Sequence, residues 1–200
     1  MPWGTDTLSA MLESAVRTRP LRRIEYERLV DLGMFAGERL ELLDGVLVVR
    51  EPQKAPHATA VQASLDTLRR VFGPGWDVRP QLPVALDEVS EPEPDMAVVP
   101  GSYRDYRNRH PVRPVLVVEI ADATLMRDRR KGELYARAKL LDYWIVNLID
   151  EVLEVYRQRH RSPGSRFGWV YAETQVFPRG AAVAPLAAPE ARVTVDDLLP

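Results

Sequence analysis

Two carboxylates in the sequence stand beside apolar strands, where an ionised side chain needs a compensating partner. Glu119 follows the apolar residues 115–118, and Asp95 follows Pro94 and precedes a second apolar run. An isolated ionised carboxylate is costly to bury, and two carboxylates side by side repel unless a cation lies between them. Their oxygens suit Mg²⁺ or Mn²⁺, which take one or two carboxylates together with water and phosphate oxygens. The pair therefore indicates a site where a metal activates water and stabilises charge on a phosphodiester.

Two further charged residues are candidates for the same cluster. Lys131 follows Glu119 in a predicted helix, and its ammonium suits holding a nucleophilic water or a phosphate oxygen. Glu41 stands among leucines in the run RLELLDG, so its carboxylate also needs a partner. Plainer interpretations remain open for all four residues. Asp95 could cap a turn, and Glu119 could pair with an arginine. Lys131 could lie on a solvated helix face, and Glu41 could be exposed on an edge strand.

The elements that must position these residues alternate between helices and strands. Apolar spacing and stop signals predict helices over residues 22–33, 57–73 and 127–140, with His57 opening the second. Asp44-Gly45 predicts the turn of a hairpin within residues 39–51. Residues 114–121 are predicted to form a central strand, with further strands over 76–87, 95–99, 142–147, 151–158 and 166–173. This order predicts an α/β (α+β) domain with a mixed sheet.

Composition and charge narrow the range of possible functions. The chain has 200 residues, of which 46% are hydrophobic and 28% charged, as in an ordinary globular domain. Its net charge of -2 provides no global attraction for nucleic acid, so such contacts need a local basic patch. The absence of cysteine excludes disulfides and thiolate chemistry. Asp6 and Glu13 interrupt any signal-peptide core, and no apolar run reaches the length of a membrane span. We therefore expect a soluble, cytoplasmic protein that does not contact membranes.

Four features in a fixed order carry a family resemblance. They are RLELLDGVLVV, His57, EPEPDMAVVP, and PVLVVEIADAT followed by RDRRKGELYARAKLLDYWIVN. This set, from about residue 24 to residue 156, resembles the Uma-type restriction endonuclease family, a branch of the PD-(D/E)XK nuclease superfamily. The resemblance implies a restriction-endonuclease-like fold, a central mixed β-sheet flanked by helices. We expect it over residues 21–175, with residues 1–20 as an N-terminal arm and residues 176–200 as an Ala/Pro-rich tail.

The resemblance also implies an activity, the Mg²⁺- or Mn²⁺-dependent hydrolysis of phosphodiester bonds in DNA. It implies that Asp95 and Glu119 hold the metal and that Glu41 is the acid of the first strand region. The superfamily's lysine would fall two residues after Glu119, where this chain has Ala121, and Lys131 fits a lysine recruited from the following helix. The alternative is a catalytically impaired nuclease fold that binds nucleic acid or a protein partner.

Basic residues near the predicted site suggest how nucleic acid could be held. Arg127, Arg129 and Arg130 are candidates for phosphate contacts, and so are the arginines of residues 104–113, although both groups could equally be solvated. A homodimer is also expected, because nucleases that cut both strands often pair their sites across a two-fold axis.

Overall fold

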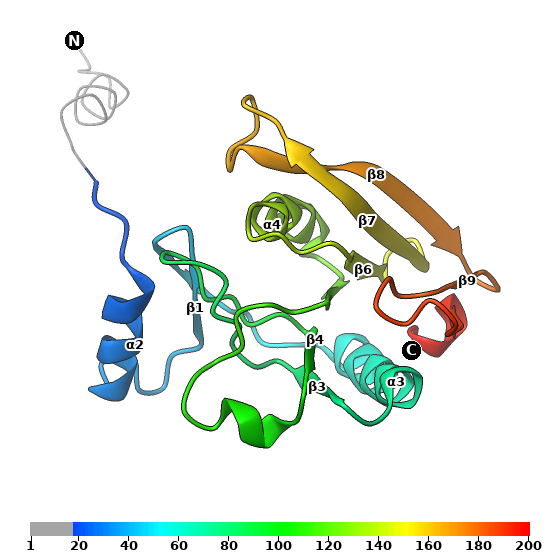
Figure 1. The fold of residues 1–200 in the computed structure, drawn as a ribbon, viewed down its shortest axis with the longest axis horizontal. Helices are drawn as coiled ribbons and strands as arrows, with labels where there is room; N and C mark the ends of the chain where they lie inside the picture. Colours follow the sequence, from blue (N-terminus) through cyan, green and yellow to red (C-terminus); the bar gives the residue numbers. More distant parts are fainter. Residues whose placement is uncertain (1–17) are drawn as a thin grey trace, which may run out of the picture.

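A six-stranded mixed sheet forms the centre of the fold in a computed structural model that describes residues 18–200 (Figure 1). The strand order is β3-β4-β5-β6-β7-β8, with β5 and β6 parallel and all other neighbours antiparallel. The strands are β3 (Trp76–Pro80), β4 (Met96–Pro100), β5 (Leu116–Ala121), β6 (Tyr143–Asn147), β7 (Val152–Arg161) and β8 (Trp169–Pro178). The predicted central mixed sheet is confirmed, and β3 lies at its edge as its prolines indicated.

Helices lie on both faces of this sheet and enclose two cores. The helices are α2 (Arg23–Asp31), α3 (Ala55–Phe72) and α4 (Leu125–Arg137), close to the three predicted ranges. Side chains of a strand alternate between its faces, so Val118 and Ile120 of β5 join the core that includes residues of α3. Val117 and Ala121 join the core that includes Tyr135 of α4. Glu119 shares one face of β5 with Val117 and Ala121, so its side chain also lies on the α4 side of the sheet. Within residues 18–200, no helix has the length and apolarity to cross a membrane.

The last residues of the chain complete the core on the α3 side. Strand β8 continues to Pro178, so the predicted domain boundary at residue 175 falls inside a strand. Short strands β9 (Ala182–Val183) and β10 (Val193–Thr194) pair with each other, and a 3-10 turn η2 (Val195–Asp197) follows. Val193, Val195 and Leu198 are fully buried. Residues 176–200 therefore differ from the predicted tail, because their alternating apolar residues cover α3. Residues 1–17 of the predicted arm lie outside the described residues.

A separate hairpin positions the first acidic candidate. Strands β1 (Leu40–Leu43) and β2 (Val46–Val49) flank the predicted Asp44-Gly45 turn. Backbone hydrogen bonds in both directions between Leu42 and Glu91 dock β1 onto the segment that leads into β4. Tyr26 of α2 donates a hydrogen bond to the Leu40 carbonyl at 3.1 Å. The hairpin is thus held on two sides.

Gly45, in the turn of this hairpin, lies in close contact with Pro20. Its φ is +77°, and a Cβ at this position would lie 2.2 Å from Pro20 Cβ and 2.7 Å from Pro20 Cα. Gly33 offers a matched control, because its φ is +71° and a Cβ there would have nothing within 4 Å.

We therefore expect Gly33→Ala to lower the free energy of unfolding by about 1 kcal/mol, the cost of the left-handed conformation alone. Gly45→Ala should cost clearly more, because Pro20 and Leu21 must also move off the turn. Urea unfolding of both variants measures the difference, and equal losses would contradict the close contact.

Candidate active site

All four predicted site residues line one cleft of about 170 Å³. Four parts of the chain supply them: β1 supplies Glu41, the residue before β4 is Asp95, β5 supplies Glu119, and α4 supplies Lys131. Each of these side chains is no more than 6% exposed. The interpretations in which Glu41 is exposed or Lys131 is solvated are therefore wrong.

Strand register brings the two metal-ligand candidates together. Strands β4 and β5 are antiparallel with Met96 opposite Val118, so the pairing extends to Asp95 and Glu119. The Ile120 amide donates to Asp95 Oδ2 at 2.9 Å. The Asp95 amide in turn donates to Glu119 Oε2 at 3.3 Å. The backbone of each strand thus holds the carboxylate of the other, and the orientation of the pair depends on the sheet itself.

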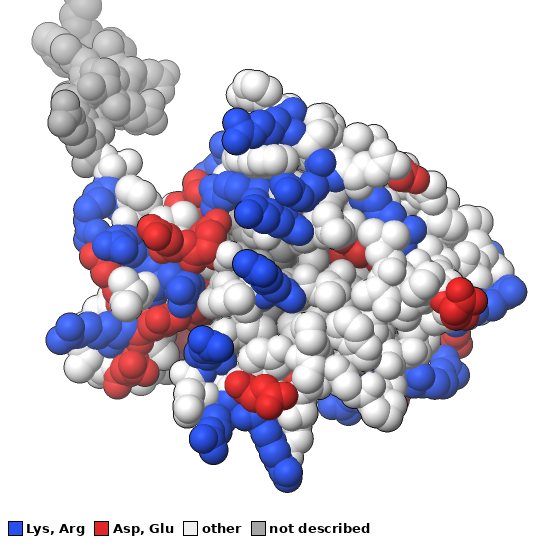
Figure 2. All heavy atoms as spheres, in the orientation of Figure 1, with Lys and Arg blue, Asp and Glu red and all other residues white. Residues whose placement is uncertain are grey.

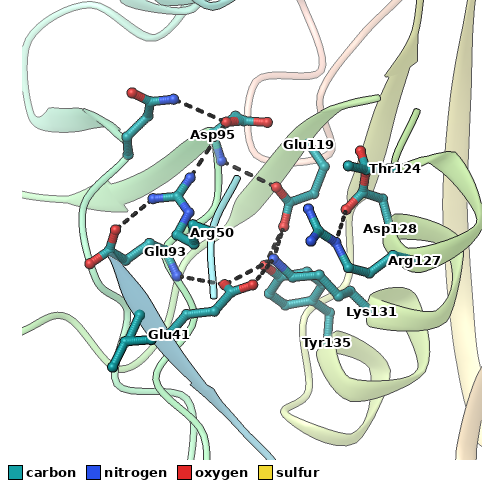
Figure 3. A network of polar contacts seen from close by, with 12 residues as sticks. Glu41, Arg50, Glu93, Asp95, Glu119, Thr124, Arg127, Asp128, Lys131 and Tyr135 are labelled. Atoms are coloured by element: carbon teal, nitrogen blue, oxygen red, sulfur yellow. Dashed lines mark hydrogen bonds and ion pairs between the residues drawn. The ribbon is translucent and has the colours of Figure 1, made fainter. Parts of the chain in front are cut away.

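Lys131 is the central cation of the cleft (Figure 3). Its Nζ lies 2.8 Å from Glu119 Oε1 and 3.1 Å from Glu41 Oε2. Tyr135, one helical turn later on the same face of α4, donates its hydroxyl hydrogen to Glu119 Oε1 at 2.8 Å. Lys131 therefore compensates the buried charge of Glu119, and the same ammonium ties the β1 hairpin to the central sheet.

Burial and crowding perturb the protonation of these groups. Burial raises the pKa of Glu119 to about 7, and the nearby carboxylates of Asp128, Asp95 and Glu41 add to the rise while Lys131 opposes it. Burial opposes the charge of Lys131, but its carboxylate neighbours more than offset this and raise its pKa. Perturbed, mutually interacting carboxylates in a cleft are typical of functional sites.

His57 is a site residue whose role the sequence did not assign. It lies in the first turn of α3, as predicted, and its Nε2 is 3.2 Å from Asp95 Oδ2. Burial opposes ionisation of Asp95, but the hydrogen bond and charge of His57 lower its pKa. His57 Nδ1 is buried without a partner among the described residues. The only sequence feature that pointed to a role for His57 was its place in the ordered set of family motifs.

Arg50 is a second residue that the sequence did not single out. Its guanidinium pairs with Glu93 at 2.5 Å and lies 3.8 Å from Asp95 Oδ1. It follows β2 directly, so the hairpin brings a cation as well as Glu41 to the cleft. Nothing in its sequence neighbourhood distinguished it from the other arginines.

The donor set of the cleft fits a hard divalent cation. Asp95 and Glu119 present carboxylate oxygens to the same space, and Mg²⁺ commonly takes one or two carboxylates with water and phosphate oxygens as the other ligands. Burial is the main cause of the raised pKa of Glu119, and the carboxylates of Asp128, Asp95 and Glu41 add to it, so a cation beside these groups would favour the ionised form of Glu119. Over residues 18–200 there is no group of three or more His, Asp or Glu side chains around a common metal position. Asp95 and Glu119 therefore stay the predicted metal ligands.

The three predicted phosphate-contacting arginines have different surroundings. Arg127 lines the cleft, and Arg130 lines a neighbouring groove. Arg129 instead forms a two-pronged ion pair with Glu154 of β7, at 2.6 and 3.0 Å, and lines neither cavity. The prediction that Arg129 contacts nucleic acid has no support from this arrangement.

Replacement by glutamine should change the free energy of unfolding in opposite directions at two buried glutamates, Glu119 and Glu154. The folded-state pKa of Glu119 lies above its ordinary value of 4.5, so the folded protein binds the extra proton between about pH 4.5 and 7 and loses stability as pH rises through this window. Glutamine resembles the protonated acid. We expect Glu119→Gln to match the parent at pH 5 and to exceed its free energy of unfolding by about 1 to 3 kcal/mol at pH 8.

Glu154 is the matched control. Burial opposes its charge, but hydrogen bonds from Arg129, Tyr156 and Asn147 lower its pKa, so its contribution is present at neutral pH and is lost as pH falls. Glu154→Gln should therefore lower the free energy of unfolding at pH 8, by about 1 kcal/mol. Denaturant unfolding at both pH values measures the pair, and a loss of several kcal/mol in Glu119→Gln at pH 8 would mean that its ion pair with Lys131 outweighs its burial.

Comparison with known proteins places this arrangement in a family. The chain matches the family model described as "Uma2: Putative restriction endonuclease" over residues 24–195. It is also similar to a crystal structure of a "putative nuclease belonging to DUF820" from Anabaena variabilis ATCC 29413, with a TM-score of 0.67 and 18% identity over 90% of this chain and 97% of that chain. At this identity the similarity establishes the fold alone. No curated protein matches the chain. Since the family match extends from α2 to η2 and covers most of the chain, the protein belongs to the Uma2 family.

Proposed function

We propose that the protein is a metal-dependent endonuclease that hydrolyses phosphodiester bonds of DNA at the cleft of Asp95, Glu119, Lys131 and Glu41. The observation that carries the proposal is the convergence of these side chains from four separate parts of the chain. Membership of a restriction endonuclease family supports the reaction class. Packing alone has no need of three buried carboxylates in one cleft, two of them paired with one lysine, since burying such charges is costly.

Asp95 and Glu119 would hold Mg²⁺ or Mn²⁺ in this proposal. Such an ion, when bound, lowers the pKa of a coordinated water and offsets charge on the phosphodiester. His57 fixes the orientation of the Asp95 carboxylate through its 3.2 Å contact. Tyr135 fixes that of Glu119 in the same way. The two ligands are thus held in place before any ion arrives.

Lys131 is suited to positioning the attacking water. An ammonium has three N–H donors, and the contacts to Glu119 and Glu41 engage two of them. Within residues 18–200 no other acceptor contacts this ammonium, so its third N–H can hold a water or a phosphate oxygen in the cleft. Glu41 assists by fixing the ammonium rather than by touching the substrate.

Lys131 on α4 can replace the superfamily lysine, which would stand at position 121 of β5, because positions 119 and 121 lie on the same face of the strand. Residues 119 and 121 share the face that α4 covers, and Ala121 is fully buried there. A small side chain at position 121 leaves room for α4 to pack closely, and Lys131 then reaches Glu119 from above the same face.

Removal of the lysine charge tests its catalytic role. We expect Lys131→Met to lower the rate of plasmid cleavage in Mn²⁺ by about 100-fold or more, the usual cost of losing one electrostatic stabiliser of a transition state. Lys139→Met is the matched control, because Lys139 lies just beyond the end of α4 and is exposed. Equal rates for the two variants would remove Lys131 from the mechanism, and Asp95→Asn tests the same cleft should Lys131→Met fail to fold.

Metal binding has a readout that does not depend on cleavage. A ligand that binds only the folded state stabilises it by mass action, by about 2.7 kcal/mol at 100 times its Kd. We expect Mn²⁺ to raise the Tm of the parent and of Lys139→Met, and to have little effect on Asp95→Asn. A parental Tm that does not respond to Mn²⁺ or Mg²⁺ would contradict the proposed metal site.

A second function rests on one specific observation. Lys131 is engaged by two carboxylates, and Ala121 stands where the superfamily lysine would be, so the fold could bind nucleic acid without cutting it. DNA binding without cleavage in Mn²⁺ or Mg²⁺ would favour this module over the endonuclease. The homodimer remains a prediction, for which a linear rather than nicked plasmid product would be the first support.

A further inference from the structure

A second cavity of about 420 Å³ opens beside the cleft and shares Arg127 and Lys131 with it. We call it the basic groove. One wall is the β1–β2 hairpin, the floor is α4, and the far end is the loop that joins β7 to β8. The residues that line it are Leu43, Val46, Val48, Arg127, Arg130, Lys131, Glu133, Leu134, Arg166 and Phe167. The groove therefore continues the cleft along the molecular surface.

The groove carries an excess of positive charge. Arg127, Arg130 and Arg166 are all exposed, whereas Glu133 is the one acidic residue among its lining residues. Among residues 18–200, neither Arg130 nor Arg166 has a carboxylate partner within 4.0 Å, although the nearby Arg129 and Arg137 do. Figure 2 shows Lys and Arg side chains gathered over α4 and the β7–β8 loop on a chain whose net charge is only -2. Nucleic-acid binding by a chain of this net charge needs a local basic patch, and such a patch lies next to the cleft.

Arginine–aromatic contacts hold the end of the groove in place. The Phe167 ring has the Arg137 guanidinium 5.2 Å from its centroid and that of Arg166 at 5.3 Å. Arg137 also bonds Asp44 in the hairpin turn at 2.5 Å, so it joins the hairpin wall to the loop. Such contacts restrict the arginine side chains before binding, which lowers the entropy that a phosphate contact would cost.

We infer that the basic groove binds the sugar–phosphate backbone of nucleic acid on one side of the scissile phosphate. The strand runs from the cleft past Arg127 and Arg130 to Arg166, and the apolar hairpin side chains contact the sugars. This inference rests on the proposed function and adds the path that the bound strand takes away from the cleft. Three exposed arginines along a groove that shares Arg127 and Lys131 with the cleft match a chain of phosphates better than a compact anion.

The arginines of residues 104–113 lie elsewhere in the fold. They follow the last residue of β4, whereas Asp95 precedes its first residue, and five strand residues span about 16 Å. None of them lines the cleft or the groove. Arg107 and Arg109 are exposed and therefore provide matched controls.

The test measures binding of a fluorescein-labelled DNA duplex by anisotropy, in EDTA to prevent cleavage and over a series of salt concentrations. The double variant Arg130→Ala/Arg166→Ala should bind about 10-fold or more weakly at about 0.1 M salt, and the slope of log K against log salt should fall by about 2. The control Arg107→Ala/Arg109→Ala should keep the parental affinity and slope. Thermal unfolding verifies that both variants are folded.

The outcomes separate this inference from the proposed function. Parental affinity and slope in the groove variant, with a parent that binds and cleaves DNA, would overturn the groove and leave the endonuclease intact. An equal loss in the control variant would also overturn it, because the footprint would then not be specific to the groove. A parent that neither binds nor cleaves DNA would overturn the proposed function and the groove together.

Discussion

The ammonium of Lys131 is the interaction on which the site depends. It lies between carboxylates of a peripheral hairpin and of the central sheet, and it is itself buried. Three charged groups in one water-poor place are tolerable only when each neutralises another, because an unpaired buried charge costs several kcal/mol. The hairpin, the sheet and α4 must therefore reach their final positions together. Mutual neutralisation explains how a cleft rich in acid can be buried.

The sheet supplies the second constraint. Because the β4–β5 pairing is antiparallel, Asp95 before one strand lies opposite Glu119 near the end of the other. The Asp95 amide donates to the Glu119 carboxylate, and the Ile120 amide donates to the Asp95 carboxylate. A shift of one residue in this register would turn Glu119 toward the α3 core and would turn Val118 and Ile120 out of that core to the α4 side. The apolar side chains of β5 fill both cores and oppose such a shift. Ordinary hydrophobic packing thus fixes the geometry of the polar site.

Sequence patterns predicted the elements well where local chemistry decides them. The Asp44-Gly45 turn, the helix that ends at Gly73 and the doubly apolar β5 all have local signals, and all were found. The carboxylate–lysine cluster could be anticipated because a charge beside an apolar strand demands a partner. The contacts of His57 and Arg50 with Asp95 could not, since they depend on how distant elements pack. Arg129 looked like its arginine neighbours in the sequence, and only the position of Glu154 on β7 distinguishes it. The alanines and prolines of the final segment concealed its apolar alternation.

The burial of that final segment has a consequence for biosynthesis. Val193, Val195 and Leu198 cover the face of the core where α3 lies, and α3 carries His57 to Asp95. During translation these residues leave the ribosome after every strand of the main sheet has emerged. The core beneath α3 therefore stays open until residues 193–198 have emerged. A chain that stopped before residue 193 would contain both acids and the lysine but would lack the residues that pack against α3, the helix that carries His57.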